Sequence, residues 1–423
     1  MPSADTIASL TAFDGRAAGS DAERRAALWL RDELSTSGRS AQIEPFWCRP
    51  SSALAHAWHA LLGLAGGLVA VSDPTVGGLM VLGALLCVLA DAATGRSPGR
   101  RLTPERASQN VVSRRDAADA DPLHHGRVRL ILTANYDAGR MGFVYRDGPR
   151  RIAARVHRTT GGLAPGWLAW IALAFWWLLV IAVARLHGTH GKTIGLLQLP
   201  PTIGLVLAIA LLIELASSPP GPAAADNAAG VAIAIALARA LDASSPSRLE
   251  VEVVLAGAGE GDGIGLRRHL GRRRRELTSE NAIVLGISAC GAGSPRWWRS
   301  DGALLPLAYH ARLRDLCAGI AHDEPALAVA PHRGRGATPA LPARIAGIPA
   351  IAIGCLDDRG LVPGSHQPAD IPAAIDNAAV DATLEFALML VEAIDAEVAR
   401  ILGAPAIDAV RATPAAGHAV SAA

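Results

Sequence analysis

Four stretches of the chain are predominantly apolar and contain no Asp, Glu, Lys or Arg that would mark a charged face. They are residues 51–72, 74–90, 159–184 and 193–213. Each approaches the roughly 20 apolar residues that a helix needs to cross the hydrocarbon core of a bilayer. A helix in the core of a soluble domain usually keeps a polar stripe, and the run GWLAWIALAFWWLLVIAVA has none. The pattern therefore predicts four transmembrane helices.

The predicted helices pair into two hairpins, residues 53–93 and 163–217. Asp73-Pro74 is a turn signal in the first, and Pro200-Pro201 predicts that the last helix begins near Thr202. Two hairpins give an even number of crossings, so the rest of the chain lies on one side. Arginines concentrate in the polar flanks rather than at the hairpin tips. The positive-inside rule then predicts a multi-pass protein of the plasma membrane with a cytoplasmic soluble domain.

The polar remainder predicts a single α/β domain that the hairpins interrupt twice. It consists of residues 1–52, 94–160 and 218–402. Helical patterns cover residues 21–37, 228–242 and 374–402. Strand patterns cover residues 41–46, 110–114, 128–135, 249–258, 281–289 and 348–355. Alternating strands and helices favour a mostly parallel central sheet flanked by helices. Residues 403–423, rich in Ala and Pro, are expected to form a disordered tail.

Composition narrows the classes of function for this chain of 423 residues. It is 51% hydrophobic and only 18% charged, which excludes a chain that is disordered throughout. The net charge of +2 gives no basic field for nucleic acid. Its five cysteines are scattered and form no C-x-x-C pair. A disulfide framework or a thiolate zinc site is therefore not expected, and a reducing compartment is favoured.

Several segments at predicted helix starts and strand ends have the texture of a known enzyme family. In chain order they are FDGRAAGSDAERRAALWLRDEL, NVV, LILTANYDAG, PAAADNAAG, VEVVLAGAGEGDGIGLRR, GIPAIAIG and SHQPADIPAAID. Together they resemble the co-catalytic zinc aminopeptidase family, which includes aminopeptidase Y, bacterial leucyl aminopeptidases and the glutaminyl cyclases. The resemblance covers nearly all of the non-membrane sequence and implies a zinc-aminopeptidase-like fold. In an open α/β sheet the ligand crevice lies at the carboxyl ends of the strands.

The resemblance also implies a two-zinc site, in which a bridging carboxylate holds two ions about 3.5–4 Å apart and a glutamate takes a proton from water. The positions changed in this chain are Asn135 for a His ligand, Ala225 for the bridging Asp, Gly259 for the base and Ser288 for a further Asp. Those retained are the ligands Glu260 and His366, together with Asp226 and Asp370. An amide is a poor zinc ligand, and Ala and Gly carry no side-chain donor.

These losses predict a catalytically inactive pseudo-peptidase with a binding or scaffolding role, and with no metal or cofactor. Glu260 and His366 would be the remnant of the metal site. The vestigial crevice would contain Asn135, Asp137, Ala225, Asp226, Gly259, Ser288 and Asp370. A purely structural role is the alternative for the three aspartates, which can accept backbone N–H bonds in loops and helix starts. His366 could likewise be a hydrogen-bonded loop residue, and Glu260 could cap a helix.

Two other functions stay open. The first is an active, membrane-bound metallo-aminopeptidase or hydrolase that acts on peptide N-termini through a single zinc. That zinc would bind Asp226, Glu260 and His366, with Asp137 or Asp262 assisting. The second is a transport-related membrane protein that the soluble domain regulates. The acidic residues in or near the spans all lie close to span ends, which argues against it. They are Asp73, Asp91 and Glu214.

The place of the second hairpin predicts which way the crevice faces. The hairpin is inserted between Asn135 and Ala225, and both follow strands at the carboxyl edge of the predicted sheet. It must therefore leave and rejoin the domain on the crevice side, so that the crevice faces the bilayer. Four arginines are expected near the headgroups, where each gains roughly 1 kcal/mol from anionic lipid. They are Arg150, Arg151, Arg155 and Arg158. The expected partners are the lipid bilayer and a membrane-proximal peptide or protein.

Overall fold

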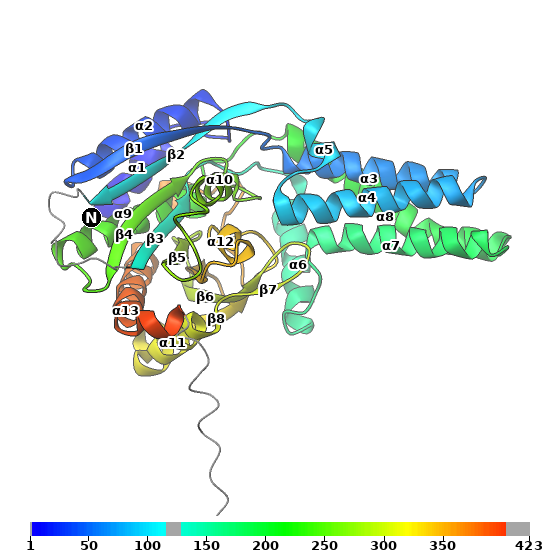
Figure 1. Ribbon diagram of the computed structural model, residues 1–423. Coiled ribbons are helices and arrows are strands. Elements are labelled where there is room, and N and C mark those ends of the chain that lie inside the picture. The colour runs from blue at the N-terminus through cyan, green and yellow to red at the C-terminus, as the bar shows by residue number, and fades with distance from the viewer. Residues whose placement is uncertain (1, 116–127, 403–423) are drawn as a thin grey trace, which may run out of the picture.

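A computed structural model of the protein describes residues 2–115 and 128–402, so the predicted disordered tail lies outside the described residues. The described part consists of an α/β domain from which long helices project to one side (Figure 1). The N-terminus lies on the domain, far from the tips of these helices.

Among the described residues, nine strands form one sheet in the order β1-β2-β4-β3-β5-β9-β6-β7, with β8 paired to β6. They span Arg39–Cys48 (β1), Arg106–Arg115 (β2), Val128–Asn135 (β3), Leu249–Ala256 (β4), Ala282–Ile287 (β5), Ser294–Asp301 (β6), Leu307–Ala308 (β7), Ala330–Arg333 (β8) and Ala350–Leu356 (β9). The central strands β4, β3, β5 and β9 run parallel. Antiparallel pairs join β1 to β2, β2 to β4 and β6 to β9. The sheet is therefore mixed, with a parallel centre.

Helices pack on this sheet along much of its width. Their bounds are Pro2–Thr11 (α1), Asp21–Ser35 (α2), Ala229–Ala243 (α9), Ile264–Arg272 (α10), Ala311–Asp323 (α11), Leu341–Ile345 (α12) and Asn377–Ile401 (α13). α2 packs against β1 and β2, α9 against β3, β4 and β5, and α13 against α9, β6 and β9. α2 begins as its sequence predicts, because the Ser20 hydroxyl accepts a hydrogen bond from the Glu23 N–H at 3.0 Å.

Four of the projecting helices form two antiparallel pairs that pack into one bundle with its own apolar core. They are α3 (Ser52–Val69), α4 (Pro74–Thr94), α7 (Trp167–Leu186) and α8 (Lys192–Ser217). Each is long and apolar enough to cross a membrane. Large apolar side chains such as Leu79, Trp176 and Leu207 are exposed on the outside of the bundle. Within the described residues, only the segment Ala224–Ala243, which joins a π-helical turn to α9, also has this length and apolarity, and most of it is buried in the domain.

α8 begins at Lys192, so the predicted start near Thr202 is wrong. Pro200 and Pro201 lie inside the helix, where their missing N–H groups remove intrahelical hydrogen bonds. Tertiary contact keeps the preceding turns helical, because the Gln198 side chain donates to the Gly67 carbonyl of α3 at 2.7 Å. The Thr202 hydroxyl also donates back to the Gln198 carbonyl at 2.8 Å.

An amphipathic helix that the sequence analysis did not assign connects β3 to the second pair of long helices. This helix, α6, spans Asp147–Thr159 and follows the short turn η2 at Phe143–Tyr145. In Figure 1, α6 runs crosswise to the long helices at their domain end. Its exposed side chains include the apolar Ile152 and Val156 as well as several arginines. Such a helix suits the plane of a membrane interface.

Candidate functional site

The crevice lies where the parallel strands β3, β4 and β5 end, beside the loop that leads into α9. One large cavity in this region is lined by five of the residues that the sequence analysis placed there or kept as metal remnants. They are Asn135, Asp226, Glu260, Ser288 and His366. The other predicted residues, Asp137, Ala225, Gly259 and Asp370, belong to the loops that form the crevice and do not line the cavity.

The Asn135 side chain fills the volume that a side chain at position 259 would need. Asn135 ends β3 and its side chain is buried. A Cβ atom at position 259 would lie 2.2 Å from the Asn135 Oδ1 atom, far inside van der Waals contact. A glutamate at 259, the family's base, therefore does not fit beside this asparagine without displacement. The two departures from the family pattern are thus sterically linked.

Ala225 is at the bridging position and has no side chain that could bind a metal. Its backbone N–H is held by the Asp370 carboxylate. The Asp370 carboxylate accepts hydrogen bonds from the N–H groups of Ala225 at 2.6 Å and Asp226 at 3.2 Å. These residues form a single π-helical turn, Ala224–Ala228, in which Asp226 departs from helical backbone angles. Burial raises the pKa of Asp370 to about 6. Asp370 therefore shapes the loop that presents Asp226.

Asp137 supports the neighbouring loop in the same way. Its buried carboxylate accepts from the N–H groups of Gly259 at 2.7 Å and Glu260 at 3.2 Å. Burial raises the pKa of Asp137 to about 6, against the opposing effect of these hydrogen bonds. The carboxylate is directed at the backbone of this loop, which it holds in place.

Asp226, Glu260 and His366 form a compact group at the front of the crevice. The His366 Nε2 atom lies 3.5 Å from Glu260 Oε2 and 3.6 Å from Asp226 Oδ2. Asp226 also accepts from the Ser365 hydroxyl at 2.5 Å, and Glu260 accepts from the Asn227 amide at 3.1 Å. Burial, and then the charge of Asp226, raises the pKa of Glu260 well above its ordinary value. Glu260 therefore pairs with side chains and does not cap α10, whose N-cap is Gly263.

His366 is held by contacts that the sequence did not reveal. Its ring stacks on Tyr145 with centroids 4.0 Å apart and an interplanar angle of 9°. Its Nδ1 atom is 2.9 Å from the Arg140 carbonyl oxygen, and its backbone adopts a left-handed φ of 56°. A Cβ atom on Gly139 would lie 2.1 Å from the His366 ring, so only glycine leaves room for it. Tyr145 belongs to no family motif, and only its position before the second hairpin could have drawn attention to it.

The donor atoms do not fit the two-zinc centre of the family. The bridging position is an alanine, and a side chain at position 259 would have to displace the Asn135 side chain. Among residues 2–115 and 128–402, no three His, Cys, Asp or Glu side chains are arranged as a group that could hold a metal ion. The His366 group comes closest, but there a single ring nitrogen contacts both carboxylates, as in an ion-paired cluster.

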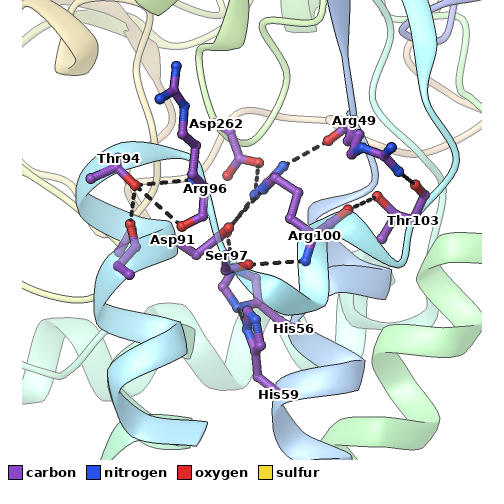
Figure 2. A network of polar contacts seen from close by, with 12 residues as sticks. Arg49, His56, His59, Asp91, Thr94, Arg96, Ser97, Arg100, Thr103 and Asp262 are labelled. Atoms are coloured by element: carbon purple, nitrogen blue, oxygen red, sulfur yellow. Dashed lines mark hydrogen bonds and ion pairs between the residues drawn. The ribbon is translucent and has the colours of Figure 1, made fainter. Parts of the chain in front are cut away.

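A second buried polar network joins the domain to the first pair of long helices (Figure 2). Arg100, in the short helix α5 (Pro98–Arg101), donates to the two oxygens of Asp91 at 2.9 and 2.6 Å and to Asp262 at 2.7 Å. Asp91 lies near the end of α4, and His56 of α3 lies 3.4 Å from it. Asp262 is therefore paired with Arg100 and does not contact Asp226, Glu260 or His366 as an assisting metal ligand would. This pairing anchors the loop that carries Glu260.

The four arginines expected near lipid headgroups differ in their surroundings. Arg151, Arg155 and Arg158 are exposed on α6. Arg150 is half-buried, lines the crevice cavity and donates to the Val362 carbonyl. Burial lowers the pKa of Arg150, against the opposing charge of Asp226. Arg150 is therefore a residue of the crevice.

The crevice continues into the bundle of long helices as one cavity of about 1610 Å³. Its polar end is the crevice just described, and its apolar part is lined mainly by side chains of α7 and α8. Sites for drug-sized ligands measure about 300–1,000 Å³, so this cavity admits a longer molecule. The crevice thus opens toward α7 and α8, as the insertion of this helix pair between β3 and α9 requires.

Comparisons with known proteins agree with this geometry. Residues 215–391 match the family profile described as Peptidase family M28. The structure resembles a zinc aminopeptidase from Bacillus subtilis (TM-score 0.52, 12% identity, 92% of this chain and 93% of that one). It also resembles an aminopeptidase from Aneurinibacillus sp. strain AM-1 (0.51, 13%, 92% and 92%) and the glutaminyl cyclase of Porphyromonas gingivalis (0.50, 12%, 92% and 96%).

Comparison with curated proteins gives no significant match. The structural likenesses are at low identity and establish the fold, while the profile match covers the crevice segments from Ala225 to His366. The predicted resemblance and fold class are therefore confirmed. The described part of the chain has the fold of the zinc aminopeptidases and glutaminyl cyclases, and residues 215–391 resemble Peptidase family M28.

Proposed function

We propose that the protein is an integral membrane protein whose peptidase-like domain binds a ligand without hydrolysing it. The pairs α3/α4 and α7/α8 would cross the plasma membrane as two hairpins, with the domain on the cytoplasmic side. The length, the apolarity and the exposed outer faces of these helices support this placement. The concentration of arginines on the domain side supports the orientation.

One observation carries the proposal of an inactive site. Asn135 fills the space in front of Gly259, and Ala225 stands where a two-zinc site needs its bridging carboxylate. Without the bridge and the base, the crevice has neither the means to hold two ions nor a group placed to activate water. What remains is a crevice lined by the carboxylates of Asp226 and Glu260, by His366 and by Arg150, and it is suited to binding.

Elemental analysis of the purified full chain tests this proposal. After dialysis the protein should contain well under one zinc per chain, and its release of aminoacyl chromophores should equal that of His366→Ala. Two zinc equivalents per chain would overturn the proposal. So would an aminopeptidase rate that the substitution of His366 abolishes.

A second candidate is a hydrolase with one zinc at Asp226, Glu260 and His366. The observation in its favour is that all three side chains meet at one point of the crevice. It predicts one tightly held zinc equivalent that is lost in His366→Ala. Cys317→Ala is the matched control, because this buried cysteine lies on α11, outside the crevice lining, and should not change the zinc content.

A transport role gains no support from the acidic residues at the spans, because each has a local partner. Asp73 caps α4 by accepting the N–H groups of Thr75 and Val76. Asp91 pairs with Arg100, and Glu214 accepts from the backbone of η2. These carboxylates terminate and anchor helices.

A further inference from the structure

The apolar part of the cavity is at least as long as one membrane leaflet, because its lining on α8 runs from Leu215 at the domain end to Pro200, about 22 Å at 1.5 Å per residue. On α7 it is lined from Trp167, where the helix leaves the domain, to Trp177. Ten residues of α-helix span about 15 Å at 1.5 Å per residue. The hydrocarbon core of a bilayer is about 30 Å thick, so one leaflet contributes about half of that. The groove is thus long enough to follow the whole acyl layer on the domain side.

The groove walls are suited to acyl chains. The α7 wall includes Trp170 and Ile171, and the α8 wall includes Leu205, Ala208 and Leu212. Trp167 and Trp170 lie at the domain end, the depth at which tryptophan is enriched between headgroups and hydrocarbon. A chain leaving the crevice along this groove would therefore pass from a polar to an apolar environment at the level of the interface.

The polar end offers acceptors for a cation and one donor for an anion. Asp226 and Glu260 stand together with His366, and neither carboxylate is in an ion pair with an arginine or lysine among the described residues. Arg150 lines the same cavity, and the charge of Asp226 favours the protonated form of the Arg150 guanidinium. A headgroup that carries both an ammonium and a phosphate matches this arrangement.

We propose that the cavity binds a phospholipid with a primary amine in its headgroup, taken from the domain-side leaflet. The ammonium donates to Asp226 and Glu260, the phosphate accepts from Arg150, and an acyl chain lies in the groove between α7 and α8. This inference rests on the proposed function, because it needs a metal-free crevice at the membrane. A trimethylated amine has no N–H to donate, so a choline headgroup would lose those hydrogen bonds.

Native mass spectrometry of the full chain in detergent tests the inference, with phosphatidylethanolamine and phosphatidylcholine of identical acyl chains as probes. We expect the ethanolamine lipid to bind about tenfold more tightly, in line with hydrogen bonds to charged groups. Asp226→Asn with Glu260→Gln should remove this preference while choline-lipid binding persists. Arg150→Gln should weaken both lipids, whereas Arg151→Gln, outside the cavity lining, should weaken neither.

The groove has its own pair of matched variants on α8. A Cβ atom at Gly204 or at Gly195 would meet no atom within 4 Å, so both positions are open to a larger side chain. Only Gly204 lines the cavity. Gly204→Leu should therefore weaken both lipids about tenfold, and Gly195→Leu should leave both unchanged.

Three results would overturn the inference. They are equal affinity for the two lipids, unchanged binding in Gly204→Leu, and tighter binding of a peptide with a free N-terminus than of the ethanolamine lipid. The zinc measurement separates this inference from the proposed function. A zinc-free protein that shows no lipid preference would refute the lipid alone, whereas two zinc equivalents would refute the inactive crevice.

Discussion

At the scale of single residues, the loss of the metal site is a matter of packing as well as of missing ligands. Asn135 and Gly259 come from different strand ends, yet they share one space. The sequence alone could identify each as a departure from the family pattern, because neighbouring residues fix the register. The sequence could not show that the Asn135 side chain crowds any side chain placed at position 259. That crowding depends on the distance between the end of β3 and the loop after β4.

Gly259→Ala should lower the free energy of unfolding by about 1–3 kcal/mol, because the new methyl group overpacks against Asn135. Asn135→Ala in the same chain should relieve most of that cost, and the two changes should show a coupling energy in a double-mutant cycle. Denaturant unfolding of the detergent-solubilised protein measures both. Gly271→Ala is the control, because a Cβ there meets no atom within 4 Å. Additive costs would show that the two positions do not share space.

A buried acid–base cluster gives the domain a pH-dependent stability. His269 of α10 lies 3.1 Å from Glu44 and 3.4 Å from Glu252, and Arg273 and Arg114 face the same carboxylates. Burial opposes the charge on His269, but hydrogen bonds to Glu252 and Glu44 outweigh it and raise its pKa above 6.5. Burial likewise opposes the charge on Glu44, but hydrogen bonds from His269 and Arg273 lower its pKa to about 2.

His269→Gln should therefore destabilise the protein most in the acidic range. A raised histidine pKa contributes stability that is fully present below pH 6.5 and is lost as the pH rises through the folded value. Glu44 contributes above pH 4.5 and loses its contribution as the pH falls toward 2. We expect a loss of about 1–3 kcal/mol near pH 5.5 that shrinks toward about pH 9. An equal loss at both pH values would contradict the assignment.

At the scale of elements, the long helices and the central strands follow directly from hydrophobic pattern. The hydrophobic pattern alone does not distinguish the segment that contains α9, Ala224–Ala243, which is about as apolar as α3 yet lies in the domain core. Only its place between strands of the sheet separates it from a membrane span. α6 and η2 were not predicted, because their positions depend on contact with the crevice and with Glu214 at the end of α8.

The junction of the first hairpin with the domain depends on α5. Arg100 neutralises the buried Asp91, and Arg267 of α10 donates to the carbonyls of Ala92 and Ala93 at the end of α4. This double attachment connects α4 to the loop of Asp262 and Glu260. The sequence showed arginines in this flank, but it could not show which of them is buried.

Arg100→Gln should cost about 3–5 kcal/mol of stability, since it leaves Asp91 buried without a counter-charge. Asp91→Asn combined with Arg100→Gln should recover part of this loss. Thermal unfolding in detergent measures both. Arg151→Gln, which breaks an exposed pair with Asp147, should leave the unfolding temperature unchanged. An Arg100→Gln protein as stable as the wild type would show that the network does not hold the junction.

At the scale of the whole molecule, the proposed membrane orientation can be tested at three exposed positions. Ser72 and Thr189 lie at the tips of the two hairpins, and Asp323 lies on the domain. With cysteine at each position in turn, a membrane-impermeant maleimide applied to intact cells should label the two tips and spare the domain. Labelling at Asp323→Cys alone would place the domain outside the cell.

The order of strands in the sheet also determines at which stage of synthesis the sheet can form. β4 lies between β2 and β3 but is synthesised only after α7 and α8. The centre of the sheet therefore stays open until the second hairpin has been translated. A membrane that holds both ends of each hairpin at its surface shortens the effective loops that β1–β2 and β3–β4 pairing must close. If the proposed spans are inserted during biosynthesis, their insertion would precede the completion of the sheet. A ribosome-bound chain stalled before residue 217 should therefore remain sensitive to protease.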